Sequence, residues 1–274
     1  MIPGVFARTY ASKDPGQVFA RIRADGFDAV QFNLSCAGLD PMPAVLPDGL
    51  GAAIHAAAKA EDLTLTALSG TWNMAHPDPE RRDADQARFV SVLRAARDMG
   101  VGLVTLCTGS RDAADMWKAH PDNAGAAAWR DLRAEMDRAL GAAEAAGIDL
   151  AIEPEPGNVI ADARAARRFL DEVGSPRLGI ILDAANLLPP AALARQAEVV
   201  AEAVDLLGAE LRLVHAKDVD AAGEVVPAGR GAVDLPAFVA RVRGSGYDGA
   251  LIGHGFGEAE APEVARVLAE LCGR

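Results

Sequence analysis

The chain of 274 residues contains 27 lysine and arginine residues against 39 aspartate and glutamate residues, a formal net charge of −12, and half of its residues are hydrophobic. A charge of this sign repels phosphate backbones and anionic lipid, which argues against nucleic-acid and membrane partners. No apolar run is long enough to span a membrane, no leader-like segment opens the sequence, and the cysteines form no CxxC pair, so we expect a cytoplasmic protein.

Short apolar, β-prone runs alternate along the chain with longer segments of helical periodicity. The expected strands are residues 5–7, 29–33, 63–69, 103–108, 150–153, 178–183, 211–215 and 250–252. In the segments between them, apolar residues recur every three or four positions, as in amphipathic helices. The clearest of these segments are 86–99, 132–146, 191–207 and 235–242.

Eight strand–helix cycles predict an α/β fold, a single (βα)8 TIM barrel. A cycle takes about 34 residues here, close to the roughly 250 residues of a typical complete barrel. The expected strands are nearly continuous apolar runs, as a parallel sheet covered on both faces requires. A doubly wound open sheet is the competing architecture. Because no linker or low-complexity tract divides the chain, we expect residues 1–274 to form one domain.

Polar residues follow the expected strands at the end where barrels carry their active sites. Glu153, Asp183 and His215 each close an apolar run, so consecutive strands would aim two carboxylates and an imidazole at one space. Such ligands suit a divalent cation, namely Mn²⁺, Mg²⁺, Co²⁺ or Zn²⁺. Each residue alone has a second interpretation as a satisfied strand-end polar group. Three ligand-type residues at equivalent points of consecutive cycles favour a shared metal site.

Several motifs of the second half of the chain occur in a recognisable order. They are Glu153 after Leu-Ala-Ile, Asp183 within Ile-Leu-Asp-Ala-Ala-Asn, His215-Ala-Lys-Asp, Gly229-Arg-Gly-Ala-Val-Asp and Gly246-Tyr-Asp-Gly. In this order the chain resembles the xylose isomerase-like barrel superfamily of sugar and sugar-phosphate isomerases and epimerases, over essentially its whole length. The resemblance implies that Glu153, Asp183 and His215 are three of four metal ligands. The fourth, usually a glutamate that ends the last strand, is replaced by Gly253.

The departure at Gly253 bears on the chemistry. The resemblance implies that the first and fourth ligand glutamates act as an acid/base pair on opposite faces of the substrate, and glycine can neither bind a metal nor move a proton. His254 follows directly and is the candidate substitute, as a ligand or a general base. Adjacent strand residues point to opposite faces, so the alternative is that His254 faces a helix or the rim. The expected catalytic residues are therefore Glu153 and His254.

Five further residues near the strand ends are candidate substrate contacts: His76, Glu155, Asn186, Lys217 and Arg230. Asn186 stands where the family commonly has histidine, so it keeps a hydrogen bond and loses a titrating group. Lys217 suits a developing enolate or a carboxylate, and Arg230, between two glycines, suits an anion. Each of three features also has a purely structural interpretation. His76 could cap a helix, Glu155 could pair with Arg230, and the glycines on either side of Arg230 could simply form a turn.

The leading interpretation is a divalent-metal-dependent isomerase or epimerase of a small sugar or keto-sugar derivative. In it, Glu153 moves the proton next to a metal-chelated carbonyl. The alternatives are a metal-assisted hydrolase or lyase on the same scaffold, and a carbohydrate-binding barrel with a degenerate site and no turnover. The apurinic endonuclease branch of the superfamily gathers more histidines and a basic face, which five histidines and the acidic charge oppose. A homo-oligomer is compatible with the sequence.

Overall fold

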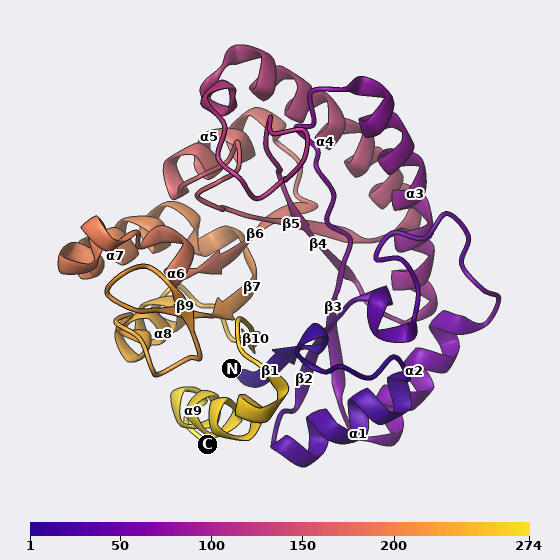
Figure 1. The fold of residues 1–274 in the computed structure, drawn as a ribbon, viewed down its shortest axis with the longest axis vertical. Helices are drawn as coiled ribbons and strands as arrows, with labels where there is room; N and C mark the ends of the chain where they lie inside the picture. The colour runs from indigo at the N-terminus through magenta and orange to yellow at the C-terminus, as the bar shows by residue number, and fades with distance from the viewer.

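Eight parallel strands close into a barrel, with the helices in a ring outside it (Figure 1). The computed structural model describes residues 1–274, and its barrel strands are joined in the order β1-β10-β7-β6-β5-β4-β3-β2. The strands are β1 Ile2–Phe6, β2 Ala29–Phe32, β3 Thr64–Ser69, β4 Leu103–Cys107, β5 Asp149–Glu153, β6 Leu178–Asp183, β7 Leu211–Ala216 and β10 Ala250–Gly253. The predicted (βα)8 barrel is confirmed, because β1 pairs with β10 and closes the sheet, whereas in an open sheet the first and last strands would not pair with each other.

A long helix follows each barrel strand and covers its outer face. The helices are α1 Pro15–Asp25, α2 Leu50–Ala60, α3 Pro79–Asp98, α4 Ala126–Ala146, α5 Ala163–Val173, α7 Gln196–Leu207, α8 Leu235–Gly244 and α9 Ala261–Cys272, and the short α6 Ala184–Leu187 precedes α7. Asp14, Asp78, Asp162 and Asp234 cap four of them by accepting backbone N–H groups of the first turn. None of the helices combines the length and the apolar composition that crossing a membrane requires.

Two local features differ from the sequence prediction. β1 begins at Ile2 rather than at residue 5, because Ile2 pairs with Ala250 in the closing β1–β10 ladder. After β7, the chain forms an antiparallel hairpin of two short strands, β8 Asp218–Val219 and β9 Val225–Val226. Strands of two residues carry no periodic pattern, so the sequence contained no signal for this hairpin.

The barrel interior is built in layers. One small buried cluster contains Ala29, Ala67, Leu103, Ala151, Ile181, Leu213, Ala250 and Ile252. Side chains alternate along a strand, so the residues two positions further on face the same interior. They are Gln31, Ser69, Thr105, Glu153, Asp183, His215 and His254. The apolar layer is therefore followed, toward the carboxyl ends of the strands, by a polar one.

Candidate active site

Glu153, Asp183, His215 and His254 meet in this polar layer, and their ligand-type atoms, one from each residue, all lie within 4.8 Å of one another. His215 Nδ1 is 3.1 Å from Glu153 Oε1, and His254 Nε2 is 3.1 Å from Asp183 Oδ2. The two imidazole rings meet edge to face with their centroids 4.6 Å apart. The three side chains from the strands are buried, whereas that of His254 is 20% exposed. The structure thus brings the three expected ligands together and adds His254.

Gly253, the last residue of β10, and His254, which directly follows it, point to opposite sides of the barrel wall. A Cβ atom at position 253 would lie 3.0 Å from Leu268 Cδ1 and 3.2 Å from Val264 Cγ1, both on α9. A side chain at 253 would therefore point into the layer between the strand and its helix. The position that points toward the centre of the barrel is 254, in step with Ile252 of the inner apolar cluster.

Gln31 and Thr105 orient His215, and neither residue was predicted from the sequence. Gln31 Nε2 donates to Thr105 Oγ1 at 3.2 Å, which leaves the amide oxygen 2.8 Å from His215 Nε2. When His215 donates its Nε2 proton to Gln31, Nδ1 is the nitrogen that faces Glu153. The available signal was that Gln31 and Thr105 are polar residues within apolar strands, two positions after interior residues.

Asn186 and Lys217 connect the two carboxylates of the cluster. Asn186 Nδ2 donates to Glu153 Oε1 at 2.9 Å, and Asn186 Oδ1 accepts from Lys217 Nζ. Lys217 Nζ also lies 3.6 Å from Asp183 Oδ2. Asp183 Oδ1 accepts the backbone N–H of Ala185 at 2.9 Å and so caps α6. These contacts hold both carboxylates in place from several elements.

The charges of the buried cluster compensate one another. Burial raises the pKa of Glu153 and of Asp183, but the cations beside them, His215 and Lys217 respectively, prevail and hold both pKa values below their usual range. Burial lowers the pKa of Lys217, yet the neighbouring carboxylates, Asp183 first, raise it to about 12. Burial and the charge of Glu153 raise the pKa of Glu155 to about 8, so Glu155 is largely protonated at neutral pH.

His76 and Arg230, two of the predicted substrate contacts, lie outside this cluster. His76 Nδ1 accepts from the backbone N–H of Asp78 at 3.1 Å, and Nε2 lies 3.2 Å from the carbonyl oxygen of Ala113. His76 therefore links the loop after β3 to the loop after β4. Arg230 is half exposed and forms ion pairs with Glu263 and Glu260.

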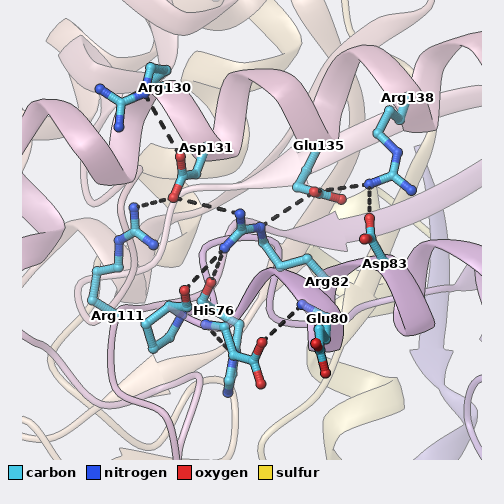
Figure 2. A network of polar contacts seen from close by, with 11 residues as sticks. His76, Glu80, Arg82, Asp83, Arg111, Arg130, Asp131, Glu135 and Arg138 are labelled. Atoms are coloured by element: carbon cyan, nitrogen blue, oxygen red, sulfur yellow. Dashed lines mark hydrogen bonds and ion pairs between the residues drawn. The ribbon is translucent and has the colours of Figure 1, made fainter.

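An ion-pair network between α3 and α4 anchors the same two loops (Figure 2). Arg82 of α3 lies 3.4 Å from Glu135 and 3.7 Å from Asp131, both on α4, and donates to the carbonyl oxygen of His76. Arg111, from the loop after β4, donates to Asp131 at 2.7 Å. Both arginine side chains are nearly buried, at 11% and 8% exposed. The network fixes the rim of the barrel beside the site.

Asp218 organises the loop that follows β7. Its carboxylate is fully buried and accepts backbone N–H groups at 2.9–3.0 Å from Val219, Gly229, Gly231 and Val233. A Cβ atom at Gly231 would lie 2.2 Å from Asp218 Oδ1, so only glycine allows this close approach. The hairpin and the Gly229–Gly231 turn are therefore folded around one carboxylate.

One cavity reaches the cluster from outside, and a second reaches a residue beside it. An open cleft of about 600 Å³ leads to His254 between the end of β1, the β8–β9 hairpin and the segment after β10. A second cavity of about 390 Å³ reaches Asn186 from the loop after β5. Either volume falls in the range of small-molecule sites.

A family model described as a xylose isomerase-like TIM barrel matches residues 19–271 of this chain. The chain belongs to this family. The resemblance inferred from the metal-ligand motifs is thereby confirmed. A search of curated protein sequences found no match.

Solved structures of sugar epimerases share the fold. The 3-keto-D-glucoside 4-epimerase YcjR from E. coli matches with a TM-score of 0.76 and 20% identity, over 100% of each chain. D-psicose 3-epimerase from Clostridium cellulolyticum H10, with D-tagatose, matches with a TM-score of 0.72 and 18% identity, over 99% of this chain and 98% of that one.

Two further solved structures share the fold but do not carry the name of an epimerase. The IolI protein with a bound zinc atom has a TM-score of 0.75 and 16% identity, over 99% of this chain and 98% of that one. The chain also covers 42% of a xylose isomerase-like TIM barrel/4-hydroxyphenylpyruvate dioxygenase fusion protein, which in turn covers 99% of this chain with a TM-score of 0.74 and 17% identity. All of these identities are low, so the matches relate the folds alone.

Proposed function

We propose that this protein is a divalent-metal-dependent isomerase or epimerase of a small sugar or keto-sugar derivative. The observation that carries the proposal is the convergence of two carboxylates and two imidazoles in the polar layer of the barrel. The family membership and the epimerases among the structural neighbours support the same class of reaction.

The donor set fits a divalent cation. Donor atoms within 4.8 Å of one another match, to within small side-chain rotations, the spacing around an ion with bonds of about 2.1 Å. Glu153, Asp183, His215 and His254 would hold the ion, and mixed oxygen and nitrogen donors suit Zn²⁺, Mn²⁺ or Co²⁺ better than Mg²⁺. Bound there, the cation supplies Lewis-acid polarisation of a carbonyl and its adjacent hydroxyl.

Glu153 is the residue best placed to move a proton. Its Oε1 atom carries the contacts to both Asn186 and His215, so Oε2 has no protein partner. Without an ion, the charge of His215 lowers the pKa of Glu153 against the effect of burial, and a bound cation would act in the same direction, so Glu153 stays ionised as a base must be. The ammonium of Lys217 lies beside it, where it can donate to a substrate oxygen that gains negative charge.

The position of His254 favours isomerisation over epimerisation. Epimerisation by two bases requires a proton-transfer group on each face of the substrate. His254 contacts Asp183 and is itself one of the four donors, while position 253 points toward α9. Glu153 is then the carboxylate that takes and returns the proton on one face.

A second candidate function is carbohydrate binding without turnover. Lys217 lies beside Asp183 without any ion, and Glu153 raises the pKa of His215 against the effect of burial, which favours the positive charge of the imidazole beside Glu153. A cluster whose carboxylates have cationic partners of their own does not need a metal ion to offset their charge.

Metal analysis and proton exchange separate the two candidates. We expect the purified protein to bind about one equivalent of Zn²⁺, Mn²⁺ or Co²⁺ and to incorporate solvent deuterium next to the carbonyl of ketoses. Asp183→Asn should abolish both, whereas Asp149→Asn, at the opposite end of the barrel, should change neither. Sugar binding without metal or exchange would support the second candidate and overturn the first.

A further inference from the structure

Arg8 lies in a 3₁₀ turn, Ala7–Thr9, directly after β1, and its side chain lines the cleft that leads to His254. The backbone of this segment is fixed from both sides. Ala7 and Tyr10 are buried, and the Tyr10 hydroxyl donates to Asp25 at 2.8 Å. The backbone of Arg8 is therefore anchored beside the cleft, and its exposed side chain lines the cleft wall.

Arg8 carries an uncompensated charge in this cleft. No carboxylate lies within 4 Å of its guanidinium, because the acids nearby have other partners. Glu260, which also lines the cleft, accepts the backbone N–H of Gly257 at 2.8 Å and lies 3.7 Å from Arg230. Glu258 accepts the backbone N–H of Ala11 and pairs with Arg21.

We propose that the substrate is anionic, with a carboxylate or phosphate at the end remote from the reacting carbonyl, and that Arg8 binds this group. The inference rests on the proposed function, because it takes the metal-type cluster at His254 as the reacting end. A guanidinium suits either anion through paired N–H donors. Lys217 does not serve this purpose, since its contacts with Asp183 and Asn186 place its ammonium at the reacting end.

The test compares three ligands of one carbon skeleton by calorimetry: D-fructose, its 6-carboxylate and its 6-phosphate. We expect an anionic ligand to bind at least about 10-fold more tightly than the neutral sugar, an advantage that falls with added salt. Arg8→Gln should remove this advantage and leave D-fructose binding unchanged. Arg88→Gln is the matched control, because Arg88 is exposed on α3, away from the cleft, and also has no carboxylate within 4 Å.

The two anionic arms show whether the group is a carboxylate or a phosphate. Equal affinity of all three ligands, failure of both anions to bind, or an equal loss for neutral and anionic ligands in Arg8→Gln would overturn the proposal. Binding is measured without turnover. An anion preference that depends on Arg8 in a protein with neither metal nor exchange would therefore uphold this inference and reject the proposed function.

Discussion

Single side chains of the site do distinct jobs that follow from their partners. Glu153 concentrates its contacts on one oxygen and leaves the other for chemistry, whereas both oxygens of Asp183 are engaged. His215 is held between Glu153 and Gln31, so one nitrogen is assigned to each side. The reactivity expected of each residue therefore depends on neighbours that lie far away in the sequence.

Gln31 acts as a positioning residue through His215. In Gln31→Leu, His215 loses the acceptor for its Nε2 proton, so metal affinity should fall about 10- to 100-fold. Chelator competition measures this affinity without any substrate. Gln31→Glu retains an acceptor at the same place and should recover most of it. A purely structural role would instead lower the melting temperature of both variants and leave their metal affinities equal.

The last strand allows a matched pair of substitutions. Gly253→Glu would press a carboxylate against Leu268, Val264 and Phe256, so it should destabilise the fold by about 3 kcal/mol or more and add no ligand to the cluster. His254→Glu should keep the stability closer to that of the parent and retain metal binding. Urea unfolding and chelator competition measure the two effects. A Gly253→Glu variant as stable as the parent would show that position 253 does not face α9.

At the scale of elements, the barrel strands supply the cluster and buried polar groups hold the loops around it. Arg82 ties α3 to α4 and to the loop after β3, and Asp218 gathers the loop after β7. Removing one partner of a buried polar contact costs more than the contact itself contributes, because the other partner stays desolvated. Both residues therefore lead to predictions about stability.

Arg82→Met should destabilise the protein by about 3 kcal/mol, because the carboxylates of Glu135 and Asp131 each lose a cationic partner. Arg81→Met is the control, since Arg81 is the exposed neighbour and has no carboxylate within 4 Å. Urea unfolding measures both. Equal stability of the two variants would contradict the anchoring role of the network.

Asp218→Asn should cost about 2–3 kcal/mol, because the amide group turns a donor toward backbone N–H groups that need an acceptor. Amide hydrogen exchange should become faster at Gly229, Gly231 and Val233. Asp220→Asn on the same hairpin is the control, because Asp220 is partly exposed and accepts only from its own turn. If both variants exchange alike, Asp218 does not organise the loop.

At the scale of the whole molecule, the barrel brings part of the excess of acidic residues together in one cluster. Two buried carboxylates contribute to the net charge of −12, and the proposed ion would bind only where the folded barrel assembles all four donors. A ligand that binds the folded state alone stabilises it by mass action. Metal binding should therefore be visible in global stability.

Addition of Zn²⁺, Mn²⁺ or Co²⁺ at about 100 times its dissociation constant should stabilise the fold by about 2.7 kcal/mol, and excess chelator should reverse the gain. For a protein of this size that corresponds to a rise of roughly 5–10 °C in melting temperature. Asp183→Asn should remove the shift. An equal shift in this variant would place the ion elsewhere.

Local sequence patterns determined much of this architecture. The strands are buried on both faces and therefore appear as apolar runs, and the helices that cover them appear as amphipathic segments. The number and order of the strands could therefore be predicted without tertiary contacts. Because parallel strands present their carboxyl ends at one rim, the meeting of Glu153, Asp183 and His215 was also predictable. The periods of helix and strand depend on residues only a few positions apart, so they can be recognised in the sequence.

Only the closed barrel decided the remaining contacts of the site, because those contacts depend on the register between segments far apart in the sequence. Gln31 and His215 are 184 residues apart and meet because β2 and β7 face one interior. Alternation counted from Ile252 places His254 inside and Gly253 outside, yet only the contact of His254 with Asp183 and the packing of position 253 against α9 show that this holds beyond the end of the strand. Arg230 pairs with Glu263 of α9 and with Glu260 just before that helix, rather than with a residue of the site. A side chain's partner is set by packing across the fold, which no local pattern records.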